Sequence, residues 1–255
     1  MLIDSHVHLD DKRFDEDRDK IIEDLKANGV EFVINIGADL QTSINSVELA
    51  DKYDNIYAAV GVHPHSAKDV NEDTLDQLRE MSKKDKVLAI GEIGLDFHYD
   101  NSPRDIQRKR FKDQLKLAKE VELPVIIHSR EATQETFDIM EEAQDGNLKG
   151  VLHCFSASPE MAEKYIKLGY YISLGGTVTF KNARIVREVA EALPLDKLLI
   201  ETDCPYLTPE PYRGKRNEPM YVKYVAEKIA EIKGVSFEEL VNQTNINAKK
   251  LFNIK

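Results

Sequence analysis

Two histidines near the start of the chain have a spacing that suits a metal ion. The sequence there reads Asp4-Ser5-His6-Val7-His8. In a β-strand alternate side chains share a face, so Asp4, His6 and His8 point the same way. Two imidazoles on one face can bind the same ion, and Asp4 beside them could fix the orientation of a ring. Taken alone, the pattern is also compatible with a strand that merely carries two polar residues.

Other residues with metal-binding side chains follow short apolar runs further along the chain. We expect each of them at the carboxyl end of a strand, because these ends meet on one rim of a barrel of parallel strands. Histidines scattered through a core would have no reason to follow strands, so the pattern favours the ligands of one site. The predicted metal ligands are His6, His8, Glu92, His128, His153 and Asp203.

This donor set is larger than one tetrahedral ion requires, because it offers four imidazoles and two carboxylates. It suits two ions, with the carboxylate of Glu92 as the bridge. The two histidines of the first strand and Asp203 would complete one ion, and His128 with His153 would complete the other. A pair of divalent ions is typical of phosphate ester hydrolysis, since it activates a water molecule and stabilises both the attacking and the leaving oxygen.

Three residues are candidates for the catalytic steps. Asp203 could also act as general base and accept a proton from the attacking water, and Glu92 would take part as the bridging carboxylate. His63 could form a hydrogen bond to the scissile phosphate, although its position before Pro64 is also compatible with a capping role. Glu201 shares a strand face with Asp203 and could orient a ligand or serve as a buried structural acid.

Basic and imidazole side chains near the same strand ends could bind the phosphates that flank the scissile bond. Arg130 directly follows a predicted ligand strand, and Arg213 lies in a basic loop with Lys215 and Arg216. The charges of this loop are equally compatible with a solvated surface. The predicted substrate contacts are His63, His65, Arg130 and Arg213.

A framework of strands must bring these residues together, and the hydrophobic pattern provides one. Short apolar runs alternate with amphipathic segments along nearly the whole sequence, which predicts a single α/β domain over residues 1–255. Eight strand–helix units favour a (β/α)8 TIM barrel with extra C-terminal helices, with an open doubly wound sheet as the alternative. Strands are expected at 4–8, 32–37, 56–61, 87–92, 124–128, 151–153, 170–174 and 198–203, and helices at 16–28, 41–52, 73–82, 104–121, 131–144, 159–168, 183–192, 220–233 and 237–252.

The composition limits the classes of function. A net charge of −11 has the wrong sign for a protein that coats nucleic acid, although an enzyme can hold a phosphodiester through bound cations. No apolar run approaches the roughly 18 residues of a membrane span, and no secretory leader precedes the first strand. The two cysteines, Cys154 and Cys204, give no disulfide framework. We therefore expect a cytoplasmic protein without a membrane anchor.

The residues singled out above lie in motifs that resemble those of TatD-type metal-dependent deoxyribonucleases, within the wider amidohydrolase-like barrel group. The resemblance covers nearly the full length and keeps the motif order. It implies hydrolysis of DNA phosphodiester bonds, with 3′-5′ exonuclease action on DNA ends and two divalent cations, Mg²⁺ by resemblance, with Mn²⁺ or Zn²⁺ also suited to these ligands. No stable protein partner is implied. The motifs are Asp-Ser-His-Val-His at 4–8, Gly-Val-His-Pro-His at 61–65, Gly-Glu-Ile-Gly-Leu-Asp at 91–96, Ile-His-Ser-Arg at 127–130, His-Cys-Phe-Ser at 153–156, Glu-Thr-Asp-Cys-Pro at 201–205 and Arg-Gly-Lys-Arg-Asn-Glu-Pro at 213–219.

Two rival functions remain open at the level of sequence. One is an amidohydrolase that cleaves C–N bonds on the same barrel. Many binuclear amidohydrolases bridge their metals with a carboxylated lysine on the fourth strand, whereas this chain has Glu92 there and Lys86 only at the start of that strand. This difference favours the phosphoesterase. The other rival is a metal-binding module without catalytic activity.

Overall fold

The eight predicted strands are all present. The computed structural model describes residues 1–254, and its strands lie in one sheet in the order β1 to β8, with parallel pairing. Because this order simply follows the chain, it confirms the (β/α)8 TIM barrel and excludes the doubly wound sheet, in which the strand order reverses. The strands are β1 (Leu2–Val7), β2 (Val30–Ile36), β3 (Ile56–Val60), β4 (Val87–Asp96), β5 (Val125–Arg130), β6 (Gly150–Leu152), β7 (Tyr171–Leu174) and β8 (Leu198–Ile200).

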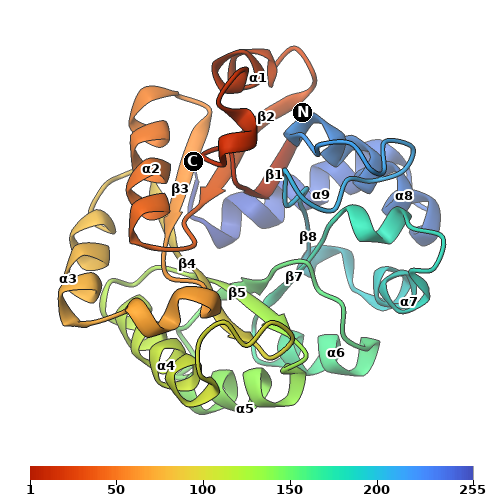
Figure 1. The fold of residues 1–255 in the computed structure, drawn as a ribbon. Coiled ribbons are helices and arrows are strands. Elements are labelled where there is room, and N and C mark those ends of the chain that lie inside the picture. Colours follow the sequence, from red (N-terminus) through yellow and green to blue (C-terminus); the bar gives the residue numbers. More distant parts are fainter. Residues whose placement is uncertain (255) are drawn as a thin grey trace. The chain divides into compact units, whose positions relative to one another are not determined.

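A helix follows each strand, and one further helix closes the described chain (Figure 1). The first is shorter than the predicted 16–28 helix: it ends at Asp24, and the chain turns through Gly29, at φ 84°, into β2. The helices are α1 (Arg18–Asp24), α2 (Leu40–Lys52), α3 (Glu72–Met81), α4 (Arg104–Glu120), α5 (Thr133–Ala143), α6 (Pro159–Lys167), α7 (Arg184–Ala192), α8 (Val222–Lys233) and α9 (Phe237–Leu251), with short 3₁₀ helices η1 (Lys12–Phe14), η2 (Pro64–Asp69), η3 (Gly176–Thr179), η4 (Leu195–Lys197) and η5 (Pro219–Tyr221).

The chain forms two compact units. The first contains Met1–Asn35, His153–Lys167 and the chain from Tyr171 onward, and the second contains Ile36–Leu152 with Leu168–Tyr170. The first unit therefore carries β1, β7, β8 and most of β2, and the second carries β3 to β6. The single domain over residues 1–255 stays a prediction.

In the first unit the N-terminal strand is joined to the last one. Val7 and Cys204 form a parallel bridge, and the N–H of His8 donates to the carbonyl oxygen of Cys204 at 2.8 Å. The carboxylate of Asp4 accepts a hydrogen bond from the N–H of Thr202 at 2.9 Å and another from its hydroxyl at 2.6 Å. Helix α9 packs on both β1 and β8 (Figure 1). These contacts hold the carboxyl ends of β1 and β8 side by side.

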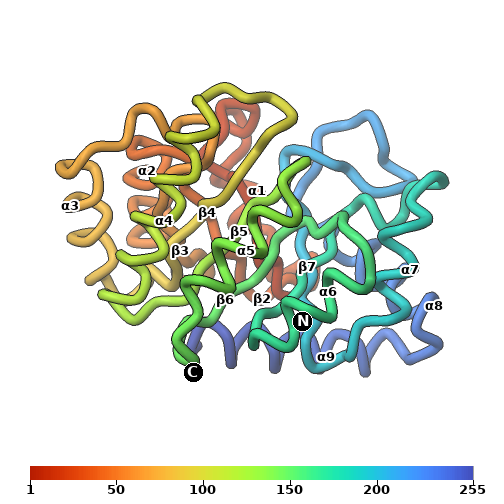
Figure 2. Tube along the Cα trace, turned by 90° about the horizontal axis from the view of Figure 1, so that it is seen from below, coloured from red at the N-terminus to blue at the C-terminus, as the bar shows by residue number. Residues whose placement is uncertain are grey.

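In the second unit β4 is the longest strand and lies between β3 and β5. Gly94 faces His128 across the β4–β5 pair, and a Cβ atom at Gly94 would lie 2.0 Å from the carbonyl oxygen of His128. Gly94 also has a φ of 145°, which residues with a side chain rarely adopt. Helix α2 packs on β3 and α4 packs on β4, while α3 lies further out and packs on α2 and α4 (Figure 2). Gly94 thus allows β4 to approach β5 closely at a predicted metal ligand.

Two of the predicted strand ends are wrong. β4 runs beyond Glu92 to Asp96, because the residues after Glu92 continue the pairing with β5. Glu92 therefore lies inside the strand rather than at its end. β8 is shorter than predicted, and Asp203 lies in the segment that follows it, with a φ of 58°.

Aliphatic side chains fill the interior of each unit. Ile93 and Ile127 are fully buried in the second unit, and Ile172 and Leu174 are fully buried in the first. Burial of each such side chain contributes roughly 1.5–3 kcal/mol, so the strands give the polar residues a stable framework. None of the helices in residues 1–254 has the length and hydrophobicity that a membrane crossing requires.

Candidate metal centre

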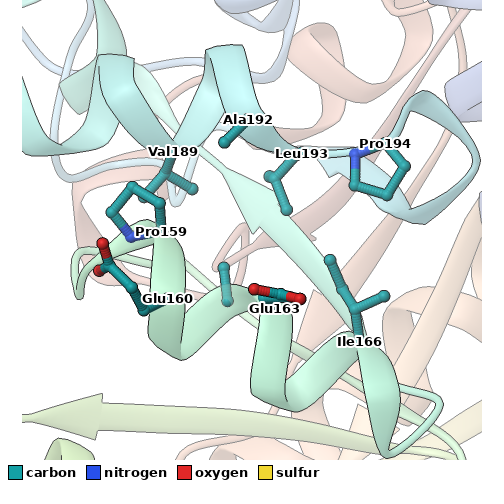
Figure 3. Close-up of a pocket in the computed structure, with 9 residues that line it drawn as sticks. Pro159, Glu160, Glu163, Ile166, Val189, Ala192, Leu193 and Pro194 are labelled. Carbon is teal, nitrogen blue, oxygen red and sulfur yellow. The ribbon is translucent and has the colours of Figure 1, made fainter.

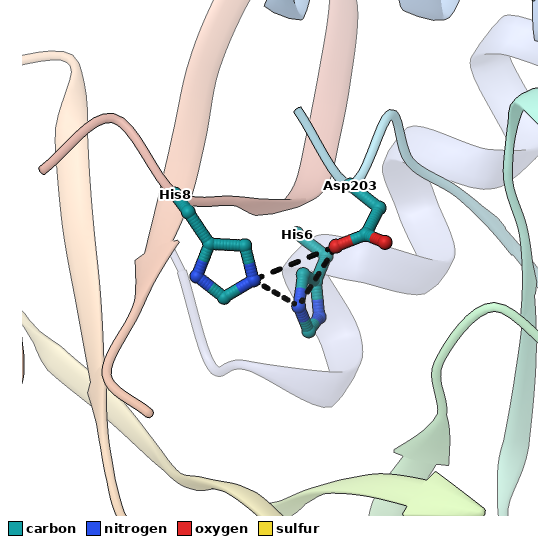
Figure 4. Close-up of side chains that lie close together, drawn as sticks. All are labelled: His6, His8 and Asp203. Atoms are coloured by element: carbon teal, nitrogen blue, oxygen red, sulfur yellow. Dashed lines mark hydrogen bonds and ion pairs between the residues drawn. The ribbon is translucent and has the colours of Figure 1, made fainter. Parts of the chain in front are cut away.

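Three donor atoms meet beyond the ends of β1 and β8 in the first unit (Figure 4). Nε2 of His6 lies 3.2 Å from Nε2 of His8. Oδ1 of Asp203 lies 3.7 Å from the His6 atom and 3.5 Å from the His8 atom. The His6 side chain is fully buried, whereas those of His8 and Asp203 are 14% and 13% exposed. The site is therefore anchored in the core and accessible at one side.

These spacings fit a divalent cation. A four-coordinate ion with bonds of about 2.1 Å holds its ligand atoms roughly 3.4 Å apart, close to the three distances observed. Two imidazole nitrogens and a carboxylate oxygen are also donors that Zn²⁺ and Mn²⁺ accept. When no ion lies between them, the two facing Nε2 atoms gain at most one hydrogen bond. His6, His8 and Asp203 would hold the cation.

The carboxylate of Asp203 is ionised at neutral pH. Burial by itself would raise the pKa of Asp203, but the hydrogen bond with His8 and the adjacent imidazoles of His6 and His153 lower it below its ordinary value. The N–H of Asp203 donates to the carbonyl oxygen of His6 at 3.0 Å, so the backbone also fixes its position. An ionised carboxylate in this place can serve both as a metal donor and as a proton acceptor.

His153 lies against the same group of donors. Its ring stacks on that of His6, with the centroids 4.0 Å apart and the planes inclined by 15°. Oε1 of Glu201 lies 3.3 Å from Nδ1 of His153 and accepts the N–H of Cys154 at 2.7 Å. A carboxylate beside one ring nitrogen fixes the tautomer and leaves Nε2 available to a metal. This contact favours the orienting role of Glu201 over a purely structural one.

The carboxylate of Asp4 is used differently from the prediction. Its oxygens accept hydrogen bonds from Thr202 and from the backbone N–H of His6, so it ties β1 to β8 instead of orienting an imidazole ring. Burial raises the pKa of Asp4 well above its ordinary range, against the hydrogen bonds from Thr202. Asp4 therefore positions the two strands that carry the donors.

A second donor group lies in the second unit and consists of His63, Glu92 and His128. Oε1 of Glu92 lies 2.8 Å from Nδ1 of His128 and 3.7 Å from Nε2 of His63. Nδ1 of His63 accepts the N–H of His65 at 3.1 Å and so caps η2. Neutral His63 then carries its proton on Nε2, so in this state it offers a hydrogen bond and not a metal bond. The predicted capping and donor roles of His63 are thus compatible with each other.

Asp96 is a functional candidate that lies outside the predicted set. Its Oδ2 lies 3.1 Å from Nε2 of His128 and 3.0 Å from Nε2 of His65, and its Oδ1 accepts the N–H groups of His98 and Tyr99. Burial would raise the pKa of Asp96, but these hydrogen bonds, that of His128 foremost, lower it well below its ordinary range. A buried anion therefore fixes two imidazoles. The sequence signal for it was its place at the end of the motif at 91–96.

The basic residues near the donors differ in whether their charge is compensated. Arg130 and Arg213 are exposed and lie over aromatic rings, 4.8 and 4.1 Å from the ring centroids. Arg216 instead pairs with Asp17 at 2.6 Å and with Glu218 at 3.0 Å. Arg216 thus ties its loop to the segment before α1, whereas Arg213, which no carboxylate of the described residues pairs with, fits a phosphate contact better.

The predicted metal ligands are divided between the two units. Four of them lie in the first unit, and Glu92 and His128 lie in the second. The second ion, with His128 and His153 among its ligands, therefore stays a prediction.

A groove in the first unit, between α6 and α7, has a different character (Figure 3). Its volume is about 290 Å³, and its lining is mostly apolar, with Ile166, Val189 and Leu193 among the lining residues. Glu160 and Glu163 are its only charged lining residues in the described chain. Two carboxylates without an imidazole do not resemble the donor groups above.

The chain matches the family model of TatD-related DNases over residues 3–253. It is 50% identical to the uncharacterized metal-dependent hydrolase YabD of Bacillus subtilis, and the match covers all of both chains. It is 34% identical to the 3′-5′ ssDNA/RNA exonuclease TatD of a Rahnella species, over 96% of each chain. Among solved structures, the TatD homolog YjjV of Escherichia coli superposes with a TM-score of 0.94 at 32% identity, covering 100% of this chain and 98% of that one.

Proposed function

The chain belongs to the family of TatD-related DNases, and on this premise we propose that it hydrolyses phosphodiester bonds with the help of divalent cations and acts on DNA from its 3′ ends. The observation that carries the proposal is the meeting of His6, His8 and Asp203 within a metal's reach. The relative named a 3′-5′ ssDNA/RNA exonuclease supports nucleic acid as the substrate class. Bound cations would also offset the net charge of −11 that opposes binding of a polyanion.

The chemistry is divided among a few side chains. A bound divalent cation would supply Lewis-acid polarisation of the phosphoryl group and a nucleophilic water near neutral pH. Asp203, ionised among its imidazole neighbours, accepts the proton of the attacking water. His63 donates its Nε2 proton in a hydrogen bond to a phosphate oxygen. Glu201 and Asp96 hold the rings of the neighbouring histidines in place.

Two cations are part of the proposal, with Mg²⁺ as the family's expected ion and Mn²⁺ or Zn²⁺ as alternatives. His6, His8 and Asp203 would hold one of them. Glu92, with the remaining two histidines of the predicted set, would supply the ligands for the other. His65, Arg130 and Arg213 contact the phosphates of the substrate. The expected cytoplasmic location is part of the same proposal.

The test combines metal content with turnover in one preparation. Wild-type protein and Glu92→Ala are loaded with Mg²⁺, Mn²⁺ or Zn²⁺ and incubated with single-stranded DNA, a generic phosphodiester and a panel of cyclic amides. We expect the wild-type protein to shorten DNA from its 3′ end and to leave the amides intact, and Glu92→Ala to lose metal and turnover together. Glu48→Ala, at an exposed position of α2, is the matched control and retains both. Cleavage of the amides but not of DNA would overturn the proposal.

A further inference from the structure

Each unit presents one exposed tyrosine beside a histidine of the predicted site, a metal ligand in the first unit and a substrate contact in the second. In residues 1–254 these two, Tyr99 and Tyr206, are the only exposed aromatic residues other than histidine, with 54% and 46% of their surface accessible. Tyr206 contacts His8, and Tyr99 contacts His65. A single exposed tyrosine is ordinary on a protein surface, but here the arrangement is repeated: in each unit the ring contacts a histidine and has an arginine over it.

The tyrosine of the first unit is held firmly. Its ring meets that of His8 edge-on, with the centroids 6.1 Å apart and the planes inclined by 78°. The guanidinium of Arg13 covers one face of Tyr206, 4.2 Å from the ring centroid. Arg13 is itself fixed by Asp11, which accepts hydrogen bonds from Nε at 2.9 Å and Nη2 at 2.7 Å. One face of the ring is thus occupied, and its exposed surface is held beside a metal donor.

The tyrosine of the second unit has the same surroundings. The ring of Tyr99 stands at 90° to that of His65, with the centroids 5.3 Å apart. The guanidinium of Arg130 lies 4.8 Å from the centroid of Tyr99. The N–H of Tyr99 donates to Asp96, so the backbone of this loop is fixed to the anion that holds the histidines. An arginine–tyrosine pair beside a histidine therefore occurs in both units.

From this repetition we infer that Tyr206 and Tyr99 are platforms on which unpaired nucleobases of a single-stranded nucleic acid stack. A base offers a flat π-face that an exposed aromatic ring covers without reading its identity, and arginine over the ring strengthens such stacking. A base inside a duplex is already stacked on its neighbours, so these platforms accept only unpaired bases. The inference rests on the proposed function and deepens it by naming the two residues that would contact the bases of the substrate.

The test follows base stacking without hydrolysis. Short single strands that carry 2-aminopurine are titrated with the full-length protein in EDTA, and their fluorescence is quenched where the base stacks on a ring. A separate incubation in Mg²⁺ measures cleavage of the same strands. Matching strands with abasic sugars report the contribution of the backbone alone. We expect the wild-type protein to quench and to prefer the base-bearing strand, and Tyr206→Leu and Tyr99→Leu each to weaken its binding about 5- to 150-fold without changing the abasic strand.

The control is Tyr53→Leu. The ring of Tyr53 also lies under a cation, that of Lys52, but Tyr53 precedes β3 whereas His63 follows it, so Tyr53 is at the other end of the strand. This variant retains the preference for the base-bearing strand, and Tyr206→Phe retains most of the quenching because it keeps the ring. The stacking platforms would be overturned if the wild-type protein bound the base-bearing and abasic strands equally. They would also be overturned if the leucine variants lost the same affinity for both strands. Quenching without any DNA cleavage would overturn the proposed function and leave the platforms standing.

Discussion

Oδ2 of Asp96 lies 3.1 Å from Nε2 of His128, while Nδ1 of the same ring faces Glu92 at 2.8 Å. The carboxylate of Asp96 thus holds Nε2 of the imidazole, and Nδ1 is left facing Glu92, the carboxylate of the second donor group. Contacts of this kind set the tautomer and the basicity of a metal-binding histidine.

The first prediction is that Asp96→Asn lowers the affinity for Mn²⁺ about 10- to 100-fold, because the ring of His128 loses its charged acceptor. Calorimetric titration measures the affinity. The fold persists, since the amide oxygen still accepts the N–H groups of His98 and Tyr99. Asp100→Asn is the control in the same loop, where the carboxylate pairs with Arg104. An unchanged Mn²⁺ affinity in Asp96→Asn would show that Asp96 does not orient the ring of His128 for metal binding.

The second prediction concerns the general base. Asp203→Asn keeps the shape of the side chain but loses the proton acceptor, so we expect kcat on single-stranded DNA to fall by about 10²- to 10⁴-fold. Circular dichroism and thermal unfolding check that the variant is folded. Asp196→Asn, at an exposed position of η4, is the control with wild-type turnover. Near wild-type turnover of Asp203→Asn would refute this role.

The third prediction separates two neighbouring arginines by the salt dependence of DNA binding. A plot of the logarithm of the DNA-binding constant against the logarithm of the salt concentration has a negative slope. Arg213→Ala makes this slope shallower by about 0.7, the value for one phosphate contact on a single strand. Arg216→Ala leaves the slope unchanged, because Asp17 and Glu218 already compensate its charge. Equal slopes in wild type and Arg213→Ala would exclude Arg213 from the phosphate contacts.

The fourth prediction is structural. Gly94→Ala places a methyl group 2.0 Å from the carbonyl oxygen of His128, so β4 and β5 must separate at a predicted metal ligand. We expect a loss of more than about 3 kcal/mol in the free energy of unfolding by urea, or no folded protein. Gly214 also has a positive φ but open space around its Cβ position, so Gly214→Ala costs only about 1–2 kcal/mol. Similar losses in the two variants would contradict the close approach.

The fifth prediction is a pH dependence. The hydrogen bonds from Arg13 lower the pKa of Asp11 from 3.8 to about 2. A carboxyl group with a lowered pKa in the folded protein stabilises it above the pKa of the unfolded chain, and this contribution disappears as the pH falls through the folded value. Asp11→Asn therefore lowers the free energy of unfolding by about 1 kcal/mol between pH 5 and 8, as a partly exposed ion pair would.

Below pH 4 the difference in the free energy of unfolding between Asp11→Asn and wild type shrinks as the pH approaches 2. Urea unfolding at each pH measures this difference. Asp54→Asn, at an exposed position before β3, is the matched control substitution. A difference that grows as the pH falls would contradict the assignment.

The fold and the first donor group could be predicted because both depend on local patterns. Apolar runs mark the strands, and parallel strands bring their carboxyl ends to one edge, which is where His6, His8 and Asp203 meet. The alternation also predicts each helix to within a few residues, apart from the early end of α1 at Asp24.

The remaining features depend on contacts between distant segments. The stretch after Glu92 contains Gly94 and resembles a loop, yet it continues β4 because β5 approaches the bare backbone there. Asp4 finds its partner Thr202 at a separation of 198 residues, so the sequence around Asp4 does not indicate that contact. The tyrosine–arginine pairs join segments that are far apart in the chain and have no spacing rule that a sequence pattern could reveal.

The bond between Asp4 and Thr202 also determines when the first donor group can exist during synthesis. A ribosome releases the histidine pair early, and the carboxylate that completes the group emerges only after most of the chain has been made. Closing so long a segment costs entropy that a lone pair of imidazoles cannot repay. The three donors of this group can therefore meet only after nearly the whole chain has been made, so the site is a late product of folding.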